Sequence, residues 1–80
     1  MKTLVFTAAA AKQFDGLPTT AREALEAALS GYAIDGRGDV KKLQGRDGFR
    51  MRVGDYRILF DENRVTILAV YIGRRQSNTY

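Results

Sequence analysis

The sequence predicts an α+β fold in which an N-terminal strand and two helices pack with a mostly antiparallel, four-stranded β-meander sheet. Three observations predict it. An apolar strand pattern opens the chain, apolar residues at helical spacing follow, and alternating apolar and polar residues fill the second half. The length of 80 residues fits one domain, residues 1–80, and is too short for a dinucleotide-binding fold.

The first half of the chain predicts a strand and two helices. Residues 2–6 form the strand, and Thr7 caps a helix that runs to about residue 17, where Pro18 ends it. Thr20 and Glu23 form a capping box for a second helix that reaches about Ile34. This helix has an apolar, core-facing stripe that consists of Ala21, Leu25, Ala28, Leu29 and Tyr32.

The second half predicts three strands. Residues 35–39 form a loop, and residues 40–45 give no clear pattern, although their two lysines fit a turn. Residues 49–53 alternate strictly and are joined to a strand at 56–60 by a type II′ turn at Gly54 and Asp55. After a turn at 61–64, in which Asp61 is expected to pair with Arg64, residues 65–72 are apolar on both faces. They form an interior strand that Gly73 ends.

The composition excludes several kinds of chemistry. The chain has no cysteine and no histidine, which excludes disulfides, thiolate chemistry, zinc sites of the Cys/His type and histidine-dependent catalysis. No apolar run is long enough to span a membrane, and residues 1–7 lack the features of a signal peptide. We therefore expect a cytoplasmic protein that has no contact with membranes and needs no metal or cofactor.

Positive charge gathers in the second half. Residues 1–39 contain four basic and five acidic side chains, whereas residues 40–80 contain nine basic and four acidic ones. A basic half-chain fits a polyanionic or acidic partner, although a solvated surface explains a small surplus equally well.

The predicted hairpin brings like charges together. A two-residue turn sets Arg52 opposite Arg57 and leaves Arg50 on the same face, where we expect no carboxylate. Neighbouring guanidinium groups suit phosphate binding because each is planar and always charged. The alternative is that each arginine reaches water or pairs with a carboxylate near Asp35 or Asp39.

These residues resemble a known family. The segment FRMRVGDYRILF at 49–60, preceded by KKLQG at 41–45 and followed by VYIGRR at 70–75 and Tyr80, is similar to the RelE/ParE toxin superfamily, in its RelE branch. The resemblance covers essentially the whole chain and implies the RelE fold. It also implies the toxin of a type II toxin–antitoxin module, which cleaves mRNA in the ribosomal A site without a metal.

The resemblance implies a set of site residues. Arg57, Arg75 and Tyr80 match the family's catalytic positions, and Arg50 and Arg52 occupy positions that are lysines in RelE. Four further basic residues are expected to bind the RNA backbone, namely Lys41, Lys42, Arg46 and Arg74.

The proton acceptor is left open. Arginine does not lose its proton in proteins, so Tyr80 becomes the leading proton carrier, with Asp55 or Asp61 as a distant alternative that the register places off the arginine face. Arg75 could instead hold an acidic antitoxin, and Tyr80 could be a tail residue that packs on Tyr71.

The resemblance also implies partners. These are a RelB-like antitoxin that is partly disordered alone, the ribosome with its mRNA, and operator DNA reached only through the antitoxin complex. Two other functions stay open, a ParE-like inhibitor of DNA gyrase and an inactive paralogue that only binds an antitoxin.

Overall fold

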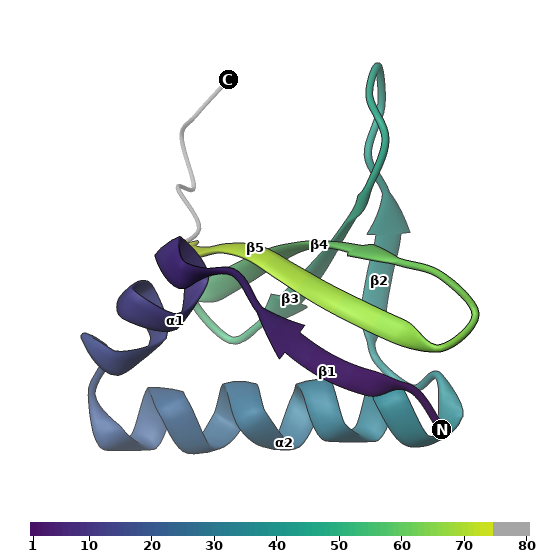
Figure 1. Cartoon of the computed structure of the whole chain (residues 1–80). Helices are drawn as coiled ribbons and strands as arrows, with labels where there is room; N and C mark the ends of the chain where they lie inside the picture. The colour runs from purple at the N-terminus through teal and green to yellow at the C-terminus, as the bar shows by residue number, and fades with distance from the viewer. Residues whose placement is uncertain (75–80) are drawn as a thin grey trace.

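The structure, a computed structural model, describes residues 1–74 and contains five strands and two helices (Figure 1). In chain order the elements are β1 (Thr3–Phe6), α1 (Ala8–Asp15), α2 (Thr19–Asp35), β2 (Asp39–Lys42), β3 (Phe49–Val53), β4 (Tyr56–Glu62) and β5 (Thr66–Arg74). The strands form one sheet in the order β1-β5-β4-β3-β2, with β1 parallel to β5 and the other pairs antiparallel. The predicted α+β class and meander are confirmed.

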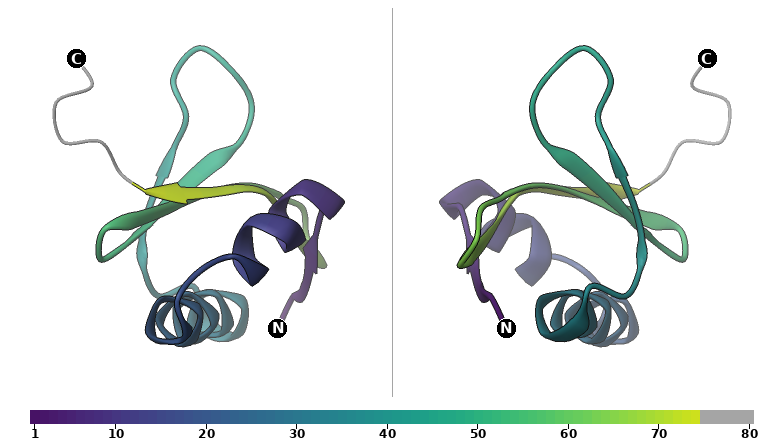
Figure 2. Two further views of the ribbon diagram at one scale, coloured as in Figure 1. Left: turned by 90° about the vertical axis from the view of Figure 1, so that its left-hand side faces the viewer. Right: turned by 90° about the vertical axis from the view of Figure 1, so that its right-hand side faces the viewer.

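The prediction of four strands was wrong, because the sheet has a fifth strand at one edge. Residues 39–42 pair with β3 as β2, where sequence analysis left a loop and a turn. This strand lies at the sheet edge, and of its residues only Val40 is even half-buried, so the apolar alternation that indicates a strand is nearly absent. From this strand the β2–β3 connection rises away from the helices (Figures 1 and 2).

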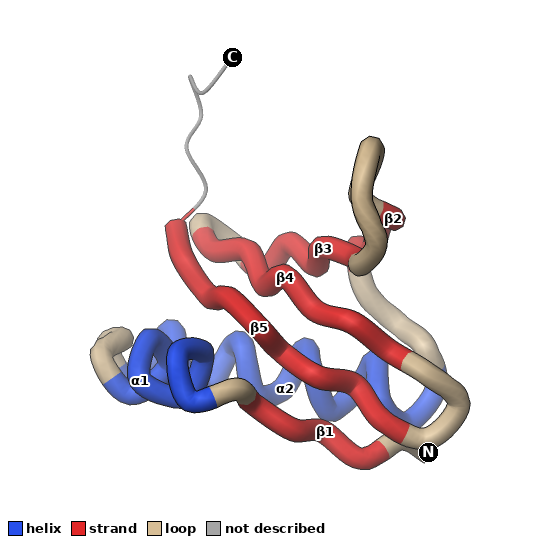
Figure 3. Tube along the Cα trace, turned by 45° about the horizontal axis from the view of Figure 1, so that its top comes forward, coloured by secondary structure: helices blue, strands red, loops and turns tan. Residues whose placement is uncertain are grey.

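Both helices lie on the same face of the sheet (Figure 3). The Thr7 hydroxyl accepts the Ala10 N–H at 3.1 Å, so the predicted cap of α1 is confirmed, although α1 ends at Asp15 rather than near residue 17. The capping box at Thr20 was wrong. Pro18, with extended backbone, is the N-cap residue, and α2 begins at Thr19. Thr20 is therefore already helical and cannot take the non-helical backbone of a cap.

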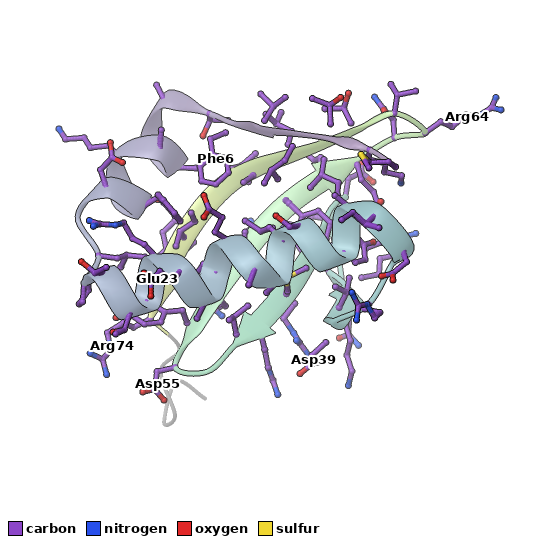
Figure 4. The ribbon with its side chains drawn as sticks, turned by 90° about the horizontal axis from the view of Figure 1, so that it is seen from below. Phe6, Glu23, Asp39, Asp55, Arg64 and Arg74 are labelled. Carbon is purple, nitrogen blue, oxygen red and sulfur yellow. The ribbon has the colours of Figure 1, made fainter. Side chains whose placement is uncertain are left out.

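The core fills the space between the helices and one face of the sheet (Figure 4). Leu25 and Leu29 of α2 are fully buried against Met51, Ile58 and Phe60 of the β3–β4 hairpin. Burial of this apolar surface is the main favourable contribution to folding. In the part of the chain that the structure describes, the helices cover only this face, and we call the opposite face the open face of the sheet.

The β3–β4 hairpin has the predicted register. Gly54 has a φ of +57°, and no residue other than glycine has a positive φ within residues 1–74, which fits the type II′ turn. Val53 lies opposite Tyr56, and Arg52 therefore lies opposite Arg57.

Strands β4 and β5 are longer than predicted. β4 continues through Glu62, and β5 continues past Gly73 to Arg74, so Gly73 does not end that strand. β5 is interior, as predicted, but a bulge interrupts its pairing. Leu59 faces Tyr71 and Phe60 faces Ala69, so Val70 is the extra residue. Over residues 1–74, neither helix has the length and apolar character needed to cross a bilayer.

Candidate functional site

The open face of the sheet carries two rows of side chains that run across neighbouring strands. We call it the arginine face. By register, the first row consists of Lys41, Arg50, Leu59 and Tyr71. The second row consists of Asp39, Arg52, Arg57 and Gly73. The three arginines that the sequence placed together therefore share one face.

Two of these arginines have buried N–H groups that find no hydrogen-bond partner within residues 1–74. They are Nη1 of Arg50 and Nε of Arg57. The side chain of Arg50 is only 15% exposed and forms an ion pair with Asp39, so the alternative of a carboxylate partner near Asp39 is confirmed for this arginine. The distance from Nη1 to Asp39 Oδ1 is 3.9 Å, too far for a hydrogen bond. A buried donor without an acceptor costs free energy, about 1–3 kcal/mol and more when it is charged. An anion with several oxygens would remove that cost.

The charge balance of the arginine face favours an anion. Arg52 and Arg57 lie directly opposite each other, an arrangement of like charges that destabilises a sheet by a few tenths of a kcal/mol. Asp39 also lies on this face, beside Arg52 in register, so the expectation that no carboxylate lies here was wrong. Its position on β2 was hidden because that strand was not predicted. One carboxylate still leaves the rows with an excess of positive charge.

The remaining predicted site residues lie in different places. Lys41 joins the arginine face, and Arg46 lies in the β2–β3 connection. Lys42 pairs with Phe49, so its side chain is on the other face of the sheet. Arg74 pairs with Tyr56 and lies over its ring, 5.8 Å from the ring centroid, so the alternation places it on the face opposite to Arg57. Arg75 and Tyr80 lie outside the described residues.

Asp61 does lie on the arginine face, contrary to the sequence-based register. Because β4 extends to Glu62, the alternation places Asp61 on the same side as Arg57 and Leu59. Among residues 1–74 no ion pair joins Asp61 to Arg64, so that expected pair was wrong. Asp55 remains in the turn, as predicted, and its side chain points away from the helices (Figure 4).

A hollow of about 340 Å³ adjoins the arginine face, and sequence reasoning missed it. Leu43, Arg46, Asp61, Val70 and Tyr71 line it. Its lining residues come from the β2–β3 connection and from β4 and β5. The position of Tyr71 in this hollow could not be predicted, because residues 65–72 are apolar on both faces and because the bulge changes which of them face outward. The Tyr-x-Gly spacing at 71–73 is the one signal in the sequence that marks this position.

A second polar cluster lies on the helix side of the sheet and serves stability. Lys2 and Tyr32 both donate hydrogen bonds to the Glu62 carboxylate. Burial raises the pKa of Glu62, but the hydrogen bonds from Lys2 and Tyr32 outweigh it, and the pKa is lowered. Burial and the hydrogen bond to Glu62 raise the pKa of Tyr32 to about 12. This cluster ties β1, α2 and β4 together.

Residues 1–74 contain no group of three or more acidic side chains that could hold a metal ion. The arginine face offers the guanidinium groups of Arg50, Arg52 and Arg57. Guanidinium groups can bind phosphate oxygens and stabilise negative charge that develops on them.

We compared the chain with protein-family models, curated sequences and solved structures. No protein-family model and no curated protein sequence matches the chain. The isolated RelE toxin of E. coli is similar, with a TM-score of 0.82 at 22% identity, over 99% of this chain and 89% of that one. The E. coli RelBE toxin–antitoxin complex gives a TM-score of 0.80 at 23% identity, over 95% of this chain and 99% of that one.

A complex from Mycobacterium tuberculosis, RelBE2, is similar at 25% identity with a TM-score of 0.77, over 92% of this chain and 98% of that one. The fold that the resemblance to RelE toxins implied is thus confirmed: the chain has the RelE toxin fold.

Proposed function

We propose that this chain is the toxin of a type II toxin–antitoxin module and acts in the cytoplasm as a ribosome-dependent mRNA endoribonuclease. The observation that carries the proposal is the opposition of Arg52 and Arg57 on the open face of a RelE fold, where Arg57 Nε has no partner. A structural role would favour arginines that are paired with carboxylates. Of the three arginines only Arg50 forms an ion pair within residues 1–74, with Asp39, and the excess positive charge that remains suits a polyanion.

The proposed reaction is a transesterification within the RNA strand. The ribose 2′-oxygen attacks the neighbouring phosphorus, the bond from phosphorus to the 5′-oxygen breaks, and a 2′,3′-cyclic phosphate forms. A base accepts the 2′-hydroxyl proton, and an acid donates a proton to the leaving 5′-oxygen. These steps require no metal, and the resemblance to RelE implies a reaction of this kind.

The three arginines of the arginine face stabilise the negative charge that builds up on the phosphate in this reaction. A positioned donor aimed at such charge contributes about 10²–10³ in rate. Arg57 is central because its neighbours across both ladders are Arg52 and Gly73, neither of which supplies a carboxylate. Arg75 is proposed to assist from beyond the described residues.

Proton transfer needs a group other than these arginines, because arginine stays protonated in proteins. We assign it to Tyr80, because a phenol can both release and donate a proton. Orientation of the message by the ribosome would allow a weak base to suffice.

The proposed partner in the cell is an antitoxin segment that is disordered alone and folds on the toxin. Two of the similar structures are toxin–antitoxin complexes, which supports this assignment. Binding of operator DNA would then belong to the complex rather than to this chain.

The direct test is toeprinting of mRNA on ribosomes that are incubated with the purified protein. We expect new 5′ ends in the A-site codon, and at least 100-fold less cleavage with Arg57→Ala. Arg64→Ala is the matched control, since it removes the same charge from an exposed turn at the β4–β5 connection (Figure 4). Intact message together with arrested gyrase supercoiling would replace the proposal with a gyrase inhibitor, and no effect in either assay would indicate an inactive paralogue.

A further inference from the structure

Tyr71 lies on the arginine face in an unusual position. It pairs with Leu59, which itself pairs with Arg50, so the ring belongs to the outer surface of the sheet. It is 38% exposed, whereas its neighbour Ile72 is buried in the core. An exposed aromatic ring beside arginines is a common feature of surfaces that bind single-stranded nucleic acid.

The ring leans along β5 over Gly73. A Cβ atom built on Gly73 would lie 2.3 Å from Tyr71 Oη and 2.7 Å from Cζ, so no side chain larger than hydrogen fits there while the ring keeps this position. Gly73 faces Arg57 across the ladder, and Cβ atoms of such pairs are about 4.5–5.5 Å apart. The phenol therefore occupies the space of the missing side chain next to Arg57.

The same ring lines the hollow of about 340 Å³ beside the arginine face. Leu43 and Val70 contribute apolar wall, Asp47 and Asp61 contribute carboxylates, and Arg46 contributes a single positive charge, so the carboxylates outnumber it. The carboxylates disfavour a phosphate in the hollow but can accept hydrogen bonds from the amino groups of a base. Charge thus separates two subsites, with phosphate on the arginines and a neutral, planar group in the hollow.

We propose that Tyr71 is a substrate-binding residue: its ring stacks on the RNA base next to the phosphate that the arginine face holds, and Gly73 is required to let the ring lie there. This inference rests on the proposed function for the identity of the substrate as RNA. It adds a base-binding subsite and a residue that sequence reasoning did not include in the site.

Three variants separate the ring from the hydroxyl. Tyr71→Ala removes the ring, and Tyr71→Phe keeps it. Gly73→Ala retains Tyr71 but displaces its ring by the added Cβ, without backbone strain because Gly73 does not have a positive φ. Gly31→Ala is the matched control, because its Cβ would meet the nearest side-chain atom, Arg37 Nη2, at an ordinary 3.7 Å.

The experiment measures binding of a 2′-O-methyl trinucleotide, which lacks the nucleophile and is not cleaved, by NMR titration of the full chain. Stacking of one base on an aromatic ring contributes roughly a five- to 150-fold gain in affinity. We expect Tyr71→Ala and Gly73→Ala to weaken binding at least fivefold, and Tyr71→Phe and Gly31→Ala to change it less than twofold. Binding of inorganic pyrophosphate should be the same in all four variants.

Equal trinucleotide affinity in the wild type and Tyr71→Ala would overturn the proposal, as would a wild type that binds no trinucleotide. A loss in Tyr71→Phe equal to that in Tyr71→Ala would also overturn it, because the hydroxyl and not the ring would then matter. Because the assay needs no ribosome, it is independent of catalysis. If the wild type cleaves mRNA but Tyr71→Ala binds the trinucleotide with unchanged affinity, only this inference is wrong. If binding depends on the ring but the wild type does not cleave mRNA, only the proposed nuclease activity is wrong.

Discussion

Replacement of Arg57 with methionine should stabilise the fold while it weakens the activity. Methionine keeps an unbranched apolar stem of similar reach but removes the guanidinium group. The change therefore removes the buried Nε that has no partner and the charge that faces Arg52 across the ladder. Both features are unfavourable in the free protein.

The size of the gain follows from these two features. Relief of a like-charge pair across a ladder contributes a few tenths of a kcal/mol. Removal of a buried unpaired donor contributes about 1–3 kcal/mol, reduced here because Arg57 is only half-buried. We expect the free energy of unfolding to rise by about 1 kcal/mol, which in a domain of this size raises the melting temperature by about 4–8 °C.

Urea unfolding and calorimetry measure the stability, and toeprinting on ribosomes measures the activity of the same preparation. Cleavage should fall by about 10²–10³. Arg64→Met, in the exposed β4–β5 turn, should change stability by less than about 0.5 kcal/mol and leave cleavage unchanged. A loss of more than about 1 kcal/mol in Arg57→Met would refute the reasoning, since it would mean that the guanidinium group is satisfied in the free protein.

Three further changes probe the rest of the account. Tyr32→Phe removes a hydrogen bond to the Glu62 carboxylate and should cost about 1.5–3 kcal/mol in urea unfolding; an unchanged midpoint would contradict the role of this cluster. In the wild type, Tyr32 has its pKa raised from 10.0 to about 12, so the stability it supplies is present below pH 10 and lost between pH 10 and 12. Glu62 has its pKa lowered from 4.5, so the stability it supplies is present above that pH and is lost as the pH falls through the pKa of the folded state. Tyr32→Phe should therefore remove the loss of stability between pH 10 and 12 and reduce the loss of stability in acid. Leu25→Ala, at a fully buried position, should cost about 2–5 kcal/mol by the same measurement, and a cost below about 1 kcal/mol would mean that the helix is not packed as described. Tyr80→Phe should reduce cleavage without changing the melting temperature. Full activity in this variant would mean that another group transfers the proton.

The hairpin could be predicted from sequence because local chemistry fixes it. A glycine at the first position of a two-residue turn indicates the turn type, and the turn determines how the residues of the two flanking strands pair. The opposition of Arg52 and Arg57 is a direct consequence, and the structure has it. The capping residue Thr7 was predictable for the same reason, since its partner is only three residues away.

The parts that could not be predicted depend on tertiary pairing. Strand β2 exists because β3 offers it a partner, and its own residues have almost no apolar pattern. Asp39 and Asp61 reach the arginine face only because β2 forms and because β4 is longer than its apolar pattern indicates. Tyr71 faces outward after a bulge at Val70, and a single extra residue of this kind leaves no mark on a strand that is apolar throughout.

The salt dependence of RNA binding tests most directly whether the unpaired guanidinium groups hold a nucleic-acid backbone. For single strands, each neutralised phosphate adds about 0.7 to the slope of log affinity against log salt concentration. Arg57→Gln should reduce the slope measured with an uncleavable oligonucleotide by about 0.7, while Arg64→Gln should leave it unchanged. Equal slopes in the wild type and Arg57→Gln, with the fold intact, would contradict the account.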